Sequence, residues 1–337
     1  MHKGILLGAL AGLAVTASAA SATTLDDVKA RGALKCGVNV GLAGFSAPDQ
    51  AGRWQGFDVD YCRALAAAIF GDQEKVEFTP ATTETRFTAL VSGEIDVLAR
   101  NTTWTFSRDV DLKLDFVGVN YYDGQGFMVS KDLGVTSAKE LDGATICIQT
   151  GTTTELNLAD FFTTNGMSYQ PVPIQSESEA RQQFLGGACD AYTTDASGLA
   201  AARSGYPNPD NYIILPEIIS KEPLGPVVRH GDNQWADIVR WTFNALVAAE
   251  EYGVTKANIE EMKASDNPEI RRLLGVEGDL GMMFGLEADW AANAIAANGN
   301  YGEIFAANIG EGTPSNIARG LNAQWTDGGL IFSPPFR

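Results

Sequence analysis

After the N-terminal segment, apolar and polar positions follow a repeated strand–helix pattern. In GALKCGVNV, the alternate residues Leu34, Cys36 and Val38 are apolar, which predicts a β-strand with one buried face. A helix is predicted over residues 58–70, where apolar residues recur at spacings of three and four until Gly71. The next predicted elements are the strand KVEFTPA, a short helix over residues 87–93 and the strand EIDVLA. This order predicts a sheet covered by helices.

A second α/β cycle begins near residue 127. Its predicted elements are, in order, the strands FMVSK and GATICIQTG, a helix over residues 154–165, the strand MSYQPVPI, a helix over residues 176–185, and the strands GACDAYTTD and NYIILPE. The pattern then becomes mostly helical, with an apolar stripe from Ile238 to Ala249. The tail from about residue 266 is rich in Gly, Ala and Asn, and two or three short helices are predicted there.

The two α/β halves indicate two domains, because 337 residues exceed what one core usually holds. Strand-like segments near residues 121–127 and 219–226 connect the halves. A double connection of this kind indicates a hinge, so the sequence predicts an α/β protein whose two lobes move about it.

Residues 1–22 have the three parts of a secretory signal peptide. Lys3 precedes an apolar run from Ile5 to Val15, and Ala20-Ser21-Ala22 matches the small-residue cleavage pattern. The apolar run is too short for a membrane span, and an uncleaved anchor at the membrane surface is the alternative. We therefore expect an exported protein. Its formal net charge of −18 argues against a basic surface that binds nucleic acid.

The chain has four cysteines, Cys36, Cys62, Cys147 and Cys189. An even number in an exported protein indicates two disulfides, and the order along the chain favours Cys36–Cys62 and Cys147–Cys189. Four buried free thiols are the alternative. The sequence motifs of zinc, redox and dinucleotide sites are missing. We therefore predict neither a metal nor a cofactor.

The segment RNTTWTFSRD, residues 100–109, concentrates hydrogen-bonding groups next to Arg108. The guanidinium of Arg108, close to several threonine hydroxyls, suits the bidentate binding of a small carboxylate. The segment contains no nucleophile–base pair and no set of metal ligands. The competing interpretation is a surface ion pair of Arg108 with Asp109 or Asp111, which would contribute little stability.

An ordered set of motifs gives the chain a family resemblance. The motifs are RGALKCGVN, GFDVDYCRALA, SGEIDVLARNTTWTFSRD, DFVGVNYYDGQGFMV, QTGTTTELNL and GACDAYTTDASGLAA. With them the chain resembles the periplasmic solute-binding proteins of polar amino-acid ABC importers (family 3), and looks most like the general L-amino acid-binding subgroup. The resemblance implies a type II periplasmic-binding-protein fold, in which residues 23–123 and 224–337 form a first lobe with a C-terminal extension and residues 124–223 form a second lobe. It also implies a periplasmic monomer without a cofactor that delivers its ligand to a membrane permease.

The resemblance further implies binding roles for residues at matching positions. Arg108 and Thr103 fall where the family binds the ligand's α-carboxylate, and Asp195 falls where it binds the α-ammonium group. The other matching positions are Asn101, Thr152, Thr153, Asn39, Thr83, Arg86 and, in the loop that usually supplies an aromatic wall, Phe45.

Three of these positions have a competing interpretation, and two depart from the family pattern. Thr152, Thr153 and Asp195 are also expected helix caps. Asn39 replaces a frequent Asp, and Leu42 replaces a frequent aromatic residue. Both departures fit a permissive pocket that recognises the groups shared by all amino acids.

We therefore predict a receptor of broad specificity that closes over L-amino acids and is not an enzyme. A narrower receptor for Glu, Gln, Asp and Asn is the alternative. A periplasmic dehydratase on the same fold is a further alternative, which needs a buried acid near the leaving group. Glu84 and Glu155 lie near the expected site, but both are predicted to face solvent.

Overall fold

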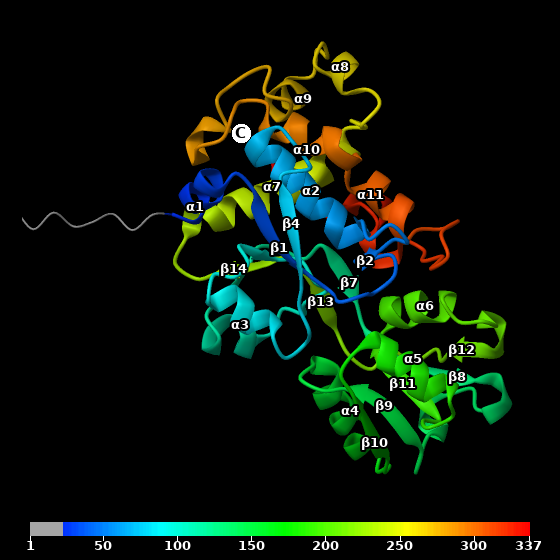
Figure 1. The fold of residues 1–337 in the computed structure, drawn as a ribbon. Coiled ribbons are helices and arrows are strands. Elements are labelled where there is room, and N and C mark those ends of the chain that lie inside the picture. The colour runs from blue at the N-terminus through cyan, green and yellow to red at the C-terminus, as the bar shows by residue number, and fades with distance from the viewer. Residues whose placement is uncertain (1–22) are drawn as a thin grey trace, which may run out of the picture.

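The computed structural model describes residues 23–337, so the predicted signal peptide over residues 1–22 lies outside the described part. Figure 1 shows two lobes, each a sheet flanked by helices, joined at a narrow middle region. The predicted α/β architecture of two sheet-containing lobes is confirmed. No helix within residues 23–337 combines the length and the apolar character needed to cross a membrane.

The first lobe is built on a five-stranded sheet with the strand order β4-β1-β5-β14-β6. Its strands are β4 (Val76–Pro80), β1 (Leu34–Val38), β5 (Val97–Leu98), β14 (Val227–Arg229) and β6 (Leu114–Phe116). The first three strands run parallel, whereas β14 is antiparallel to both β5 and β6. Because β14 follows the second lobe in the sequence, the chain visits the first lobe twice.

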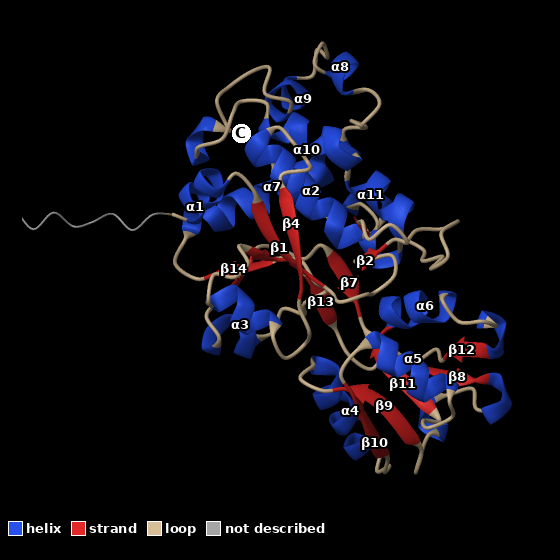
Figure 2. Cartoon of the chain, in the orientation of Figure 1, coloured by secondary structure: helices blue, strands red, loops and turns tan. Residues whose placement is uncertain are grey.

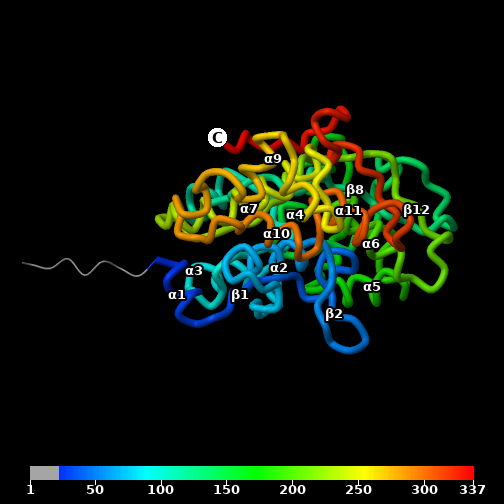
Figure 3. Tube along the Cα trace, turned by 90° about the horizontal axis from the view of Figure 1, so that it is seen from above, coloured from blue at the N-terminus to red at the C-terminus, as the bar shows by residue number. Residues whose placement is uncertain are grey.

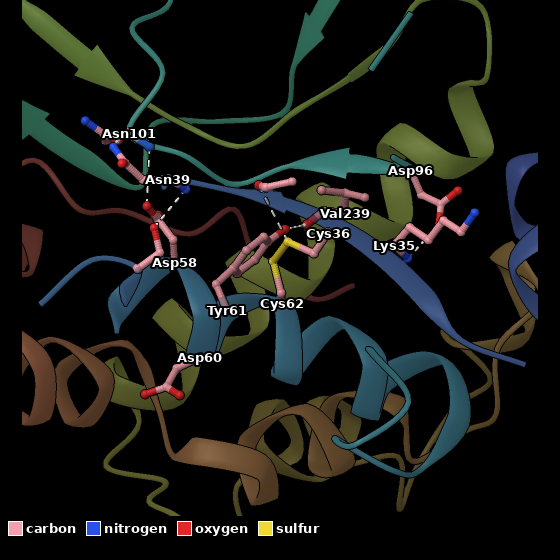
Figure 4. The surroundings of a disulfide bond; sticks show 12 residues. Lys35, Cys36, Asn39, Asp58, Asp60, Tyr61, Cys62, Asp96, Asn101 and Val239 are labelled. Atoms are coloured by element: carbon pink, nitrogen blue, oxygen red, sulfur yellow. Dashed lines mark hydrogen bonds between the residues drawn. A yellow bond between two sulfur atoms is a disulfide. The ribbon is translucent and has the colours of Figure 1, made fainter. Parts of the chain in front are cut away.

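Helix α2 (Phe57–Phe70) packs against this sheet and carries the predicted apolar stripe. It ends at Gly71, whose φ of 66° lies in the left-handed region that favours glycine. Cys62 on the buried face of α2 is bonded to Cys36 of β1, as Figure 4 shows. The first predicted disulfide is therefore present, and it ties the helix to the sheet.

Three further helices and a hairpin complete the main body of the first lobe. They are α1 (Thr24–Arg31), α3 (Arg86–Val91), α7 (Asn233–Glu251), and the hairpin of β2 (Ala47–Pro48) with β3 (Trp54–Gln55). The predicted apolar stripe of α7 is buried from Ile238 to Ala249, apart from the partly exposed Arg240 and Trp241.

The second lobe has its own five-stranded sheet with the strand order β10-β9-β11-β8-β12. Its strands are β10 (Gln170–Ile174), β9 (Thr145–Gln149), β11 (Ala191–Asp195), β8 (Gln125–Ser130) and β12 (Tyr212–Ile214), and its helices are α4 (Thr153–Thr164), α5 (Glu177–Leu185) and α6 (Ala196–Ser204). Cys147 of β9 is bonded to Cys189, which precedes β11, so the second predicted disulfide is also present.

Two short antiparallel strands join the lobes, and they match the predicted double connection. They are β7 (Tyr121–Asp123) and β13 (Glu222–Leu224), with Asp123 opposite Glu222 in the pairing. Figure 2 shows these strands between the two large sheets. The paired region is shorter than the strand-like segments predicted from the sequence.

The chain beyond α7 forms a helical extension on the first lobe. Its helices are α8 (Ile259–Met262), α9 (Pro268–Leu273), α10 (Trp290–Asn298) and α11 (Tyr301–Asn308). Helix α10 packs on both α2 and α7, in the region where Figure 3 labels all three. Single turns of 3-10 helix occur at Lys131–Leu133, Ala138–Glu140, Pro209–Asn211, Met282–Phe284, Gly320–Asn322 and Trp325–Asp327.

The end of the extension returns to the connection between the lobes. The side-chain amide of Asn322 binds both backbone groups of Tyr122 in β7: its Oδ1 accepts from the backbone N–H (2.6 Å) and its Nδ2 donates to the carbonyl (3.1 Å). Arg319 forms an ion pair with Glu250 near the end of α7 (2.8 Å). We call residues 319–324 the C-terminal strap, because they hold β7 against the first lobe.

Candidate functional site

A cleft between the two lobes gathers the predicted site residues, and its cavity volume is about 40 Å³. Its walls are formed by Asn39, Thr83, Arg86, Arg100, Asn101, Thr103 and Arg108 on the first lobe, and by Gln149, Thr152, Thr153, Thr154, Thr194 and Asp195 on the second. All predicted binding residues except Phe45 are in this set. Polar and charged side chains dominate both walls, so the cleft suits a small, hydrophilic ligand.

The loop after β5 forms the centre of the first wall. Asn101 adopts a positive φ of 34°, and its backbone N–H donates to Oδ2 of buried Asp58 (3.3 Å). The amide of Asn39 donates to Oδ1 of Asn101 (3.2 Å). Figure 4 shows these three residues side by side. Asn39 directly follows β1, so this contact joins the ends of two neighbouring strands at the cleft.

Arg108 lies on a single turn of π-helix, Ser107–Asp111, and its side chain is buried. Its Nη1 donates to the carbonyl of Thr103 (2.8 Å), and the guanidinium lies 5.2 Å from the centre of the Phe87 ring. Among the described residues, Arg108 forms no ion pair with Asp109 or Asp111. The surface ion pair considered from the sequence is therefore not formed.

Two more buried guanidinium groups line the same wall. The Arg86 guanidinium lies 4.6 Å from the Phe87 ring, and its Nε has no hydrogen-bond partner among residues 23–337. Burial and the nearby cations Arg100 and Arg108 lower the pKa of Arg86 well below its ordinary value. Burial also lowers the pKa of Arg100 to about 10, with Asp58 acting in the opposite direction. Such crowded buried cations favour a negatively charged ligand group.

The second wall begins at the N-terminus of α4. Thr152 is the N-cap residue, and its Oγ1 accepts from the backbone N–H of Glu155 (3.2 Å). Thr152 therefore caps the helix, as one interpretation predicted, and also lines the cleft. Unpaired backbone N–H groups at such a helix start favour an anion.

Asp195 ends β11 directly before α6. It occupies the N-cap position, but its side chain makes no capping hydrogen bond, and no described residue donates a hydrogen bond to its carboxylate. Burial and the negative charges of Asp123 and Glu222 raise the pKa of Asp195 well above its ordinary value, while Arg108 and Arg86 oppose the change. The carboxylate is thus buried in the cleft wall without a donor, where it can receive a cationic group.

Several residues lie differently from what the sequence indicated. Phe45 does not line the cleft: it is buried in the first lobe, with its ring centre 6.1 Å from that of Phe57 and 5.7 Å from that of Tyr121. Trp104, the neighbour of Thr103, has an aromatic side chain typical of a core, but it is 40% exposed and stacks on Phe116.

Sequence reasoning missed two charged residues at the cleft. Arg100 directly follows the predicted strand EIDVLA, so it looked like an ordinary charged residue at the end of a strand. Its positive charge was the one signal that could have pointed to the cleft. Glu222 of β13 is buried and accepts hydrogen bonds from both Thr103 (2.6 Å) and Thr153 (2.9 Å). The one feature of the sequence that could have pointed to Glu222 was a charged residue inside a predicted strand. Within residues 23–337, no cluster of three His, Cys, Asp or Glu side chains is placed to hold a metal ion.

Comparisons with known proteins identify the family of the chain. The family of bacterial extracellular solute-binding proteins, family 3, matches residues 34–258. The chain is 68% identical over 338 residues to the glutamate/glutamine/aspartate/asparagine-binding protein of Rhodobacter capsulatus, with 100% of both chains covered. It is 61% identical over 340 residues to the general L-amino acid-binding periplasmic protein of Rhizobium johnstonii. This alignment covers 99% of this chain and 100% of the relative.

A solved structure extends the likeness to three dimensions. The periplasmic binding protein of an ABC transporter from Brucella ovis, with glutathione bound, is 60% identical and has a TM-score of 0.92. The match covers 94% of this chain and 100% of that one. Since the family model spans more than half of the sequence and close relatives span nearly all of it, the chain belongs to the bacterial extracellular solute-binding proteins of family 3.

Proposed function

We propose that this protein captures free L-amino acids in the cleft between its lobes and delivers them to the membrane permease of an ABC importer, without converting them. The observation that carries the proposal is a pair of opposite charges on facing walls. The guanidinium of Arg108 belongs to the first lobe and the carboxylate of Asp195 to the second, and both line one cleft. A zwitterion with a carboxylate and an ammonium group on one carbon complements this pair.

The placement of the two charges also gives a mechanism for capture. Arg108 and the start of α4 would bind the α-carboxylate, and Asp195 would bind the α-ammonium group. A ligand gains all these contacts only when the lobes are closed, so binding shifts the population toward the closed form. In this proposal β7 and β13 are the hinge, with residues 23–123 and 224–337 on one side and residues 124–223 on the other.

The relatives support the proposal through what their names say they bind. One relative is named for general L-amino acids and another for glutamate, glutamine, aspartate and asparagine. The Brucella ovis protein holds glutathione, whose γ-glutamyl end keeps a free α-carboxylate and α-ammonium group. We accordingly propose an exported monomer that acts in the periplasm after residues 1–22 are removed as a signal peptide.

We propose broad specificity, and one observation favours the narrower alternative. Arg86 and Arg100 are buried cations beside Arg108, and the Nε of Arg86 is without a protein partner in the described chain. These groups would bind an acidic or amide side chain. The narrow receptor predicts stabilisation by Glu, Gln, Asp and Asn alone, whereas the broad receptor predicts stabilisation by most L-amino acids.

A thermal-shift screen over the twenty L-amino acids and glutathione tests the function, because a ligand that binds the folded state raises the melting temperature. Calorimetry of Arg108→Ala should then show that every ligand is weakened by about 100-fold or more, since a charge-assisted bidentate contact is lost. The exposed Arg53 provides the control Arg53→Ala, which should bind normally. Full affinity in Arg108→Ala would show that the site is elsewhere.

A further inference from the structure

Glu222 lies where the two lobes meet, and its carboxylate is almost fully buried. Thr103 Oγ1 (2.6 Å) of the first lobe and Thr153 Oγ1 (2.9 Å) of the second both donate to its Oε2. Asn157 Nδ2 (2.7 Å) and Ser220 Oγ (2.7 Å) both donate to its Oε1. Four donors therefore occupy the roughly four lone-pair positions of this carboxylate, and Glu222 itself has none left for a ligand.

The contacts of Glu222 decide what the two threonines can offer to the cleft. Each threonine hydroxyl has one proton and two acceptor lone pairs. The protons of Thr103 and Thr153 both point to Glu222, and the two oxygens lie 3.4 Å apart. Toward any other group, these oxygens can only accept hydrogen bonds. This differs from the carboxylate-donor role that the sequence suggested for Thr103.

We propose that Glu222 is a positioning residue: by taking both hydroxyl protons, it fixes Thr103 and Thr153 as acceptors that recognise the ammonium group of the ligand. The inference rests on the proposed amino-acid-binding function and adds a specificity determinant to it. An ammonium group brings only donors and is accepted. A keto oxygen at the same position brings only lone pairs and is rejected. Glu222 thereby makes the cleft discriminate amino acids from their 2-oxo acid analogues.

Calorimetry with L-glutamate and 2-oxoglutarate tests this role, because the two ligands share both carboxylates and differ at the α-position. Wild-type protein should prefer L-glutamate. In Glu222→Leu the hydroxyls are free to rotate and donate to the keto oxygen, so the ratio of the two affinities should fall by about tenfold or more. Glu222→Gln keeps an acceptor oxygen for the hydroxyls and should retain the ratio within about threefold.

The matched control is Glu217→Leu, which removes a half-buried carboxylate that binds Ser137 and Ala138 outside the cleft. Its ratio should equal that of the wild type. If Glu222→Leu does not fold, Thr153→Val and Thr153→Ser replace it: the ratio should fall in the valine variant, which lacks the hydroxyl, and persist in the serine variant.

The outcomes separate this inference from the proposed function. An equal loss of affinity for both ligands in Glu222→Leu, or in Thr153→Val, would overturn the positioning role while leaving amino-acid binding intact. Failure of the wild-type protein to bind any of the twenty amino acids would overturn the function and this inference with it.

Discussion

Asp58 illustrates how single buried charges support the cleft. Its carboxyl group accepts from the backbone N–H of Asn101 and lies near Arg100, directly behind the wall that would bind the ligand. Burial raises the pKa of Asp58 to about 7, although its contacts with Asn101, Arg100 and Asn120 act in the opposite direction. At neutral pH the group is therefore close to its own titration midpoint.

This pKa predicts how stability depends on pH. The folded protein keeps the Asp58 proton in a window from about pH 4 to about pH 7 in which the unfolded chain has lost it, so the free energy of unfolding falls as pH rises through that window. Asp58→Asn mimics the neutral form and lacks this dependence. Between pH 5 and pH 8, denaturant titrations should show the variant gaining about 2 kcal/mol relative to the wild type. Parallel pH profiles of the two proteins would contradict the assignment.

The contribution of the sequence to the site differs from residue to residue. Arg108 and Asp195 both line the cleft, as expected for Arg108 from its polar segment and for Asp195 from the family resemblance; their roles in binding stay predictions. Phe45 was expected as an aromatic wall, but its loop position did not reveal that Phe57 and Tyr121 surround the ring. Glu222 could not be assigned a role, because its partners Thr103 and Thr153 come from two lobes that only the tertiary fold brings together.

At the level of elements, the sequence predicted best those that have local end signals. Helix α5 was expected over residues 176–185 and occupies Glu177–Leu185, because Ser176 caps it and Glu179 donates its backbone N–H to that cap. Strand β5 was expected over EIDVLA, but only Val97–Leu98 is paired. The length of a short strand depends on its neighbours β1 and β14, which lie far away in the sequence.

The disulfide of the second lobe should contribute to the stability of the protein without affecting ligand affinity. Cys147 and Cys189 are separated by 42 residues, and closing a loop of this size stabilises a protein by roughly 3–4 kcal/mol in the chain-entropy model. The Cys147→Ser/Cys189→Ser variant should lose this much in a denaturant titration. Because neither residue lines the cleft, calorimetry under native conditions should find the ligand affinity within about threefold of wild type. A large loss of affinity in a folded variant would mean that the bridge also shapes the cleft.

At the level of the whole molecule, strand β7 of the proposed hinge is held from two sides. Strand β13 pairs with one side of β7, and the C-terminal strap binds the backbone of Tyr122 through Asn322. The strap is anchored to the first lobe by the Arg319–Glu250 ion pair and by Gln324, which donates to the carbonyl of Val247. The family model ends at residue 258, so this contact comes from a part of the chain outside the common family region.

Asn322→Ala tests the mechanical role of the strap. The substitution leaves the N–H and carbonyl of Tyr122 without their amide partner, a loss that corresponds to about 1–3 kcal/mol. Hydrogen exchange at Tyr122 should accelerate, and calorimetry should show all amino-acid ligands changed by the same factor. Asn298 of α10, whose amide donates among the described residues only to the carbonyl of Asp60 (3.5 Å), gives the control Asn298→Ala. Ligand-specific changes in Asn322→Ala would instead indicate a direct effect on the cleft walls.

The strap separates how tightly the protein binds from what it binds. In the proposed mechanism, specificity resides in the side chains of the cleft, whereas the free-energy difference between open and closed lobes is common to every ligand. A substitution in residues 319–324 would therefore raise or lower the affinities for all ligands by the same factor. Substitutions in the C-terminal strap, far from the ligand, could therefore adapt the affinity of the receptor to a richer or poorer supply of amino acids. The order in which it prefers its ligands would stay the same.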